Sequence, residues 1–62
     1  MGRREIEINA IVQRAYLGEI TAAAANVELD RLQVRGGWAQ GGSEFVGYDY
    51  LEQKWLDIRM EG

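Results

Sequence analysis

The N-terminal segment carries apolar side chains in a pattern that fits two different elements. From Glu5 to Ala10, isoleucine and alanine alternate with charged or amide side chains, which is the period of a half-buried strand. The apolar positions of the same segment also follow helical spacing, at Ile8, Ile11, Val12 and Ala15. Helix and strand therefore compete across residues 6–16, and the β-branched side chains favour a strand at the start.

Residues 21–35 show the clearest helical pattern. Thr21 is suited to cap a helix N-terminus, and it precedes four consecutive alanines, the best helix-forming residue. An apolar face follows at helical spacing, formed by Ala22, Ala25, Leu29 and Leu32. Arg35 suits the negative end of the helix dipole, and Gly36 suits the left-handed position that ends many helices. We therefore predict a helix that ends near Gly36.

The C-terminal segment fits two strands joined by a turn. Apolar or aromatic residues alternate with polar residues or glycine in two stretches, 46–50 and 56–60. A turn near residues 51–53 would place six side chains on one face, namely Val46, Tyr48, Tyr50, Leu56, Ile58 and Met60. Helical spacing fits as well, through Tyr48, Leu51, Trp55 and Ile58. Periodicity does not choose between the two, but the β-propensity of these residues favours strands.

These elements combine into an α+β fold in which one helix packs on a small antiparallel sheet. The alternative left open is an all-α arrangement of three short helices. The segment 38–40 lies between two glycine pairs and is expected to form a loop or the end of a hairpin. With 62 residues, the chain is expected to form one domain, residues 1–62.

The composition constrains how such a fold is stabilised. A chain of this size buries only about 60% of the surface that its unfolded form exposes. It contains no cysteine and no histidine, which excludes disulfides and nearly excludes a structural zinc site. Domains this small usually need such a staple. We therefore expect another protein or a second copy of this chain to stabilise the fold, and we expect no cofactor and no metal.

The charge is distributed unevenly along the chain. Five arginines balance five acids in residues 1–35, whereas residues 36–62 hold five acids against Lys54 and Arg59 and so carry the whole net charge of −3. Nucleic-acid-binding proteins usually show the opposite bias, so a nucleic-acid partner is not expected. No apolar run approaches the ~20 residues that span a bilayer, so a cytoplasmic protein without membrane contact is expected.

Few residues are suited to catalysis. Without histidine or cysteine, the usual general bases and thiol nucleophiles are missing. Ser43 would have only Lys54 as a base. Acid–base chemistry would need a carboxylate pair drawn from Asp49, Glu52 and Asp57. The run 36–43 fits a phosphate-binding loop except that Gly42 occupies the lysine position. We therefore expect no catalytic residues and no enzymatic activity.

Five of the six aromatic residues lie in the segment 38–55. A sheet this small is not expected to bury all of them, so some should face a partner. The candidate interface residues are Trp38, Phe45, Tyr48, Tyr50 and Trp55. Trp38, flanked by glycines, is either a lid on the core or an anchor at an interface. Trp55 is expected to pack within the fold.

Residues 14–23 are similar to the beginning of some bacterial helix-turn-helix regulators. In such a motif a second helix follows and presents basic residues to a DNA groove. Arg31 and Arg35 would take that role here, although Glu28 and Asp30 interrupt the basic face. The similarity implies a small DNA-binding regulator.

Residues 49–59, with the sequence DYLEQKWLDIR, resemble the D-Y-[VIL]-E-x-x-W-x-D-[LMI]-R stretch of the MbtH-like proteins. Those proteins are small acidic partners of nonribosomal peptide synthetase adenylation domains. Gly37 and Trp38 are similar to a Gly-Trp pair of the family, whereas Met60 stands where the family has proline. The resemblance implies an adenylation domain as the partner and a helix, rather than a strand, across residues 49–55.

The function expected from the sequence is that of a non-enzymatic protein–protein interaction module, such as a small inhibitor or accessory subunit that also self-associates. The two alternatives are an MbtH-like partner of an adenylation domain and a helix-turn-helix DNA-binding regulator.

Overall fold

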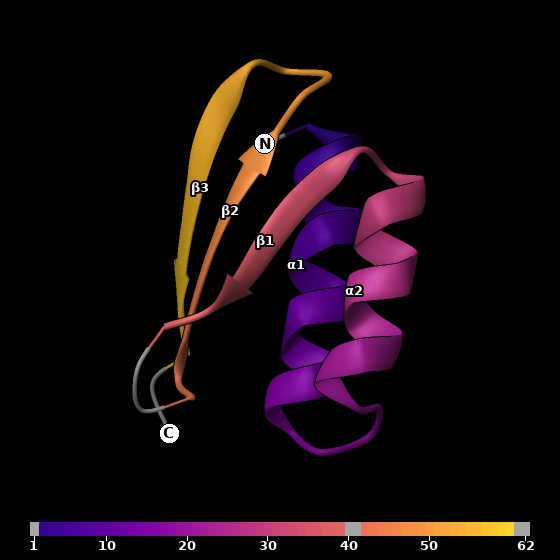
Figure 1. Cartoon of the computed structure of the whole chain (residues 1–62), viewed down its shortest axis with the longest axis vertical. Helices are drawn as coiled ribbons and strands as arrows, with labels where there is room; N and C mark the ends of the chain where they lie inside the picture. Colours follow the sequence, from indigo (N-terminus) through magenta and orange to yellow (C-terminus); the bar gives the residue numbers. More distant parts are fainter. Residues whose placement is uncertain (1, 40–41, 61–62) are drawn as a thin grey trace.

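Two helices cover one face of a three-stranded antiparallel sheet in the computed structural model, which describes residues 2–39 and 42–60 (Figure 1). The predicted α+β class is confirmed, with two helices in place of the single one expected. The strands follow one another in the sheet in the order β1-β2-β3. The elements in chain order are α1 (Arg3–Tyr16), α2 (Ala22–Arg31), β1 (Val34–Trp38), β2 (Glu44–Asp49) and β3 (Lys54–Arg59).

The strand favoured at the start of residues 6–16 is wrong, because this segment belongs to α1. Ile8 and Val12, four residues apart, are fully buried, whereas Ile6 of the alternating pattern is exposed. Helical spacing therefore brings the larger apolar set to the core, and packing outweighs the β-propensity of isoleucine and valine. Glu5 in the first turn also suits the positive end of the helix dipole.

The predicted N-terminus of α2 is confirmed, but its predicted C-terminus is wrong. The Thr21 hydroxyl accepts a hydrogen bond from the Ala24 amide at 3.0 Å. The helix ends at Arg31, and the left-handed residue beyond it is Gln33, with φ 61°, rather than Gly36. Arg35 and Gly36 lie in β1 instead. The second basic helix expected from the helix-turn-helix similarity therefore lacks Arg35.

The two C-terminal strands and the turn between them are confirmed. Residues 50–53 form the turn, and Gln53 adopts a left-handed backbone with φ 54°. The helix across 49–55 that the MbtH-like resemblance implies is wrong, as is the helical alternative for residues 48–60. Of the predicted loop 38–40, Trp38 ends β1, and residue 40 lies outside the described residues. The glycine run 36–43 likewise begins in β1, and part of it lies outside the described residues.

The prediction that six apolar side chains of this hairpin share a face is wrong. In the observed register Tyr48 pairs with Trp55 and Gly47 pairs with Leu56. Since paired residues point to the same face, Leu56, Ile58 and Met60 lie with Gly47 on the helix side. Val46 and Tyr48 lie on the opposite side, which we call the open face.

Phe45 is the centre of the core beneath the helices, and it is fully buried. The other large core residues are Ile8, Val12, Leu29 and Val34. The Phe45 ring lies over the backbone of Gly36 and Gly47, in the space that side chains would occupy at those positions. Trp38 closes the end of this cluster, with its ring edge-to-face on Phe45 at a centroid distance of 5.5 Å.

Among the residues that the structure describes, no helix combines the length and apolar character required to cross a membrane.

The position of the Phe45 ring allows a test of core packing with a matched control variant. A β-carbon at Gly36 would lie 2.3 Å from Cζ of Phe45 and 2.8 Å from the Gly47 Cα, whereas one at Gly37 would meet nothing within 4 Å. We expect Gly36→Ala to lower the free energy of unfolding by about 2–3 kcal/mol, because overpacking a filled core costs that much. Gly37→Ala, one residue away in the same strand, should change it by less than about 0.5 kcal/mol. Urea denaturation of the two variants measures the difference, and equal stabilities would contradict this account of the core.

Candidate functional site

The open face of the sheet carries an exposed group of aromatic side chains. Tyr48 lies at the end of β2 beside Trp55 at the start of β3, and Tyr50 follows in the turn. The ring of Tyr48 contacts both neighbours edge-to-face, with centroid distances of 4.9 Å to Tyr50 and 5.2 Å to Trp55. We call these three residues the aromatic patch.

The aromatic patch is open to solvent although its members contact one another. Trp55 is 72% exposed and Tyr50 is 54% exposed. The three rings and Gln53 line a shallow surface hollow. Edge-to-face contacts of this kind contribute about 0.5–1.5 kcal/mol each, so they favour the observed arrangement of the rings. The patch therefore offers an ordered aromatic surface that the fold leaves uncovered.

The turn beside the patch is held by the carboxylate of Asp49. Its Oδ1 accepts hydrogen bonds from the backbone amides of Leu51 and Glu52, both at 3.0 Å. This is the local hydrogen bonding with which aspartate favours turns. The amide of Tyr50 donates to the carbonyl of Gln33 at 3.0 Å, which ties the turn to the start of β1. These contacts fix the backbone from which Tyr50 projects.

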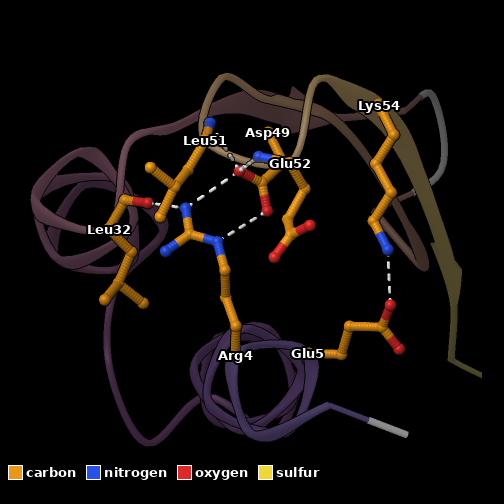
Figure 2. A network of polar contacts seen from close by, with 7 residues as sticks. All are labelled: Arg4, Glu5, Leu32, Asp49, Leu51, Glu52 and Lys54. Carbon is orange, nitrogen blue, oxygen red and sulfur yellow. Dashed lines mark hydrogen bonds and ion pairs between the residues drawn. The ribbon is translucent and has the colours of Figure 1, made fainter.

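A buried ion pair fixes the same carboxylate from the other side (Figure 2). Arg4 donates from Nε to Oδ2 of Asp49 at 2.8 Å and from Nη2 to Oδ1 at 2.9 Å. The Nη2 group also donates to the carbonyl oxygen of Leu32, just after α2. The side chain of Asp49 is 1% exposed and that of Arg4 is 18% exposed. The hydrogen bonds from Arg4 are the main reason that the pKa of Asp49 falls from 3.8 to about 2.

A second ion pair joins the same two regions. The ammonium of Lys54, at the start of β3, donates to the carboxylate of Glu5 in α1 (Figure 2). This hydrogen bond raises the pKa of Lys54 and lowers the pKa of Glu5. Both side chains are more than two-fifths exposed, so solvent screens the pair and its contribution is modest.

The structure separates the five candidate interface residues into two groups. Tyr48, Tyr50 and Trp55 form the aromatic patch, whereas Trp38 and Phe45 lie on the helix side of the sheet. Phe45 is fully buried and offers no surface to a partner. Trp38 is half-buried against the core, as expected for a lid. The expectation that Trp55 packs within the fold is wrong, because the register points it to the open face.

The candidate catalytic groups do not gather into a site. Asp49 is held as a carboxylate by Arg4, and its pKa moves in the direction opposite to that of a general acid at neutral pH. Asp57 projects from the open face and is 60% exposed. Lys54, the only base proposed for Ser43, is paired with Glu5. Among residues 2–39 and 42–60, no group of three or more acids could hold a metal ion.

Charges of both signs surround the aromatic patch on the open face. The register places Arg35 beside Tyr48 and places Arg59 beside Glu44. Asp57 lies between Trp55 and Arg59 along β3. The described part of this face therefore holds two basic and two acidic side chains, without the basic excess typical of phosphate-binding surfaces.

The sequence alone does not reveal the pairing of Arg4 with Asp49. Arg4 is one of five arginines in the charge-balanced residues 1–35, and Asp49 occupies a polar position between two tyrosines. The one available signal was the run Asp49-Tyr50-Leu51-Glu52, in which an aspartate opens a turn. That signal places the turn, but it does not show that the carboxylate points inward.

No family model, curated protein or solved structure matches this chain.

From the Arg4–Asp49 pair we predict that the free energy of unfolding depends on pH in the acid range. The pKa of Asp49 is about 2 in the folded protein and 3.8 ordinarily, so the fold favours the ionised carboxylate. Its stabilisation is present above about pH 4 and should be lost as the pH falls toward 2. The difference corresponds to about 2 kcal/mol, which urea denaturation at a series of pH values measures.

Asp49→Asn should remove this acid-dependent step and lower the free energy of unfolding at pH 7 by about 3 kcal/mol, because Arg4 loses its buried counter-charge. Asp57→Asn removes the same charge from an exposed position and serves as the control, with a change below about 0.5 kcal/mol. An unchanged profile between pH 4 and pH 2 in Asp49→Asn would show that other carboxylates control acid unfolding.

Proposed function

We propose that this chain is a non-enzymatic protein–protein interaction module that binds a partner protein through the aromatic patch and also associates with itself. The observation that carries the proposal is that Tyr48, Tyr50 and Trp55 contact one another as one group on the open face, where Tyr50 is 54% exposed and Trp55 is 72% exposed. Tryptophan and tyrosine are the side chains most enriched among residues that dominate binding energy at protein interfaces.

The arrangement of the patch supports a binding role over a structural one. Trp55 keeps 72% of its surface in solvent, so it adds little to the burial that stabilises the fold. The two hydrogen bonds to Asp49 hold the adjacent turn in place. Little ordering of the patch is then needed on binding, which favours affinity.

The charge around the patch supports a protein partner over a nucleic acid. Aromatic rings on a sheet also stack on single-stranded bases, but such surfaces combine the rings with a basic groove. Here Asp57 and Glu44 accompany Arg35 and Arg59 on the open face. Mixed charge around an aromatic centre is instead the usual composition of a protein interface and its rim.

Self-association is supported by the small core. Five large apolar residues form the buried cluster, and the absence of cysteine and histidine removes the usual covalent and metal staples. Burying further apolar surface between copies would supply stability that a single chain of this size lacks.

Truncating Trp55 should mainly weaken partner binding, whereas truncating Trp38 should mainly lower the stability of the fold. Trp55→Ala should leave the free energy of unfolding within about 1 kcal/mol of the wild type, because the side chain is mostly exposed. It should weaken partner binding by about 2 kcal/mol or more. Trp38→Ala should instead lower stability by about 3 kcal/mol or more, because the indole packs on Phe45. Thermal denaturation by circular dichroism measures both stabilities.

Binding is measured by comparing the proteins that immobilised wild type, Trp55→Ala and Val27→Ala retain from cell extract. Val27 is a matched control, since it is 57% exposed and lies on α2, away from the patch. A specific partner should be lost with Trp55→Ala and kept with Val27→Ala. Partners retained equally by all three proteins would contradict the proposed site, and tight binding of a single-stranded oligonucleotide that depends on Trp55 would replace the protein partner with a nucleic acid.

A further inference from the structure

The outer edge of β3 exposes backbone hydrogen-bonding groups in a regular row. β3 lies at one side of the sheet with β2 as its neighbour (Figure 1). The amide of Met60 donates to Ser43, so Met60 and the alternate residues before it point their backbone groups toward β2. The backbone groups of Trp55, Asp57 and Arg59 therefore point outward, where the described part of the chain provides no further strand.

The side chains of this edge strand are only partly covered. Leu56, Ile58 and Met60 pack against the core from the helix side, yet each remains half-buried rather than buried. An edge strand that combines free backbone groups with an incompletely covered apolar row is suited to pair with another strand.

The sequence of β3 complements itself when two copies run antiparallel. Only registers that pair outward-pointing residues with one another can form backbone hydrogen bonds. In one such register Ile58 meets Ile58 of the second copy, and Leu56 meets Met60 on the same face. Asp57 then lies opposite Arg59 of the second copy, and two-fold symmetry produces that pair twice.

Neighbouring registers are less favourable. When the two-fold pairing is centred on Asp57 instead of Ile58, Asp57 lies opposite Asp57 of the second copy. Like charges directly opposite each other destabilise a sheet. When the pairing is centred on Leu56, Lys54 lies opposite Ile58, and Asp57 lies opposite Trp55 without forming an ion pair. Of these three registers, only the one centred on Ile58 matches apolar with apolar side chains and opposite charges with each other.

Within one chain, Arg59 is not held firmly by its own acids. It lies 3.8 Å from Asp57 and 3.9 Å from Glu44, at the outer limit for an ion pair. The side chains of Arg59 and Asp57 are 66% and 60% exposed. Both side chains can therefore form ion pairs with a second copy without losing strong contacts within their own chain.

We infer that the chain forms a two-fold symmetric dimer in which β3 pairs antiparallel with β3 of a second copy, centred on Ile58, so that the sheets join into one of six strands. This inference rests on the self-association in the proposed function and adds the surface and register. The two-fold axis stands perpendicular to the sheet, so both aromatic patches lie on the same open face.

The test exchanges the two charges. Asp57→Arg alone places arginine opposite Arg59 twice, and Arg59→Asp alone places aspartate opposite Asp57 twice. Each single variant should dimerise about tenfold more weakly than wild type or worse. An equimolar mixture of the two variants should form a heterodimer, and the double variant Asp57→Arg/Arg59→Asp should regain the homodimer, because both restore opposite charges. Sedimentation equilibrium measures the mass against 7.0 kDa for one chain.

The matched control is the ion pair at the opposite edge of the sheet, where Arg35 of β1 lies 3.8 Å from Asp30 of α2 and both side chains are exposed. Asp30→Arg and Arg35→Asp carry the same charge changes and should dimerise like wild type. A wild-type mass of 7.0 kDa throughout the micromolar range would remove the self-association itself, and this inference with it. If the β3 variants dimerise as tightly as the wild type, only the β3 interface is overturned. The same conclusion follows if the single variants fold but neither mixing them nor combining the two exchanges restores dimerisation.

Discussion

The bidentate contact between the guanidinium of Arg4 and the carboxylate of Asp49 joins three segments that are distant in sequence. Arg4 lies in the first turn of α1, Asp49 ends β2, and the carbonyl of Leu32 just after α2 accepts a further hydrogen bond from Arg4. Burying a charge is costly unless it is paired and hydrogen-bonded, and here Asp49 also receives two backbone amides. The pair therefore disfavours other packing arrangements, because any arrangement that parts Arg4 from Asp49 leaves a buried charge without a partner.

The neighbouring ion pair between Glu5 and Lys54 adds a second contact that fixes the position of α1 along the hairpin. Arg4 and Glu5 are consecutive in α1, and their partners Asp49 and Lys54 are paired residues of the β2–β3 hairpin. A basic and an acidic side chain on the helix thus meet an acidic and a basic one on the hairpin. Sliding α1 along the sheet would break both contacts together. In a core of so few large residues, such paired charges help to select one packing arrangement.

Local chemistry explains which features the sequence predicted. The cap at Thr21, the turn after Asp49 and the two strands around it depend on neighbouring residues, and all three are present. The faces of the hairpin depend on the turn register instead. That register places Phe45 and Asp49 inward and Trp55 outward, contrary to a simple count of apolar positions. The assignment of α1 failed for a related reason, since the burial of Ile8 and Val12 needs the sheet as a partner, which no local propensity reports.

The same register separates the two surfaces proposed for binding. The aromatic patch lies at the turn end of the hairpin, around the pair Tyr48 and Trp55, whereas Asp57 and Arg59 lie toward the other end of β3. Antiparallel pairing through the second region would place the two turns at opposite ends of the joined sheet. Both patches would then face the same way at a fixed separation, so that a partner with two matching sites would bind the second as an intramolecular step and gain affinity without a new kind of contact. For a chain with so little surface, dimerisation would in this way serve recognition as well as stability.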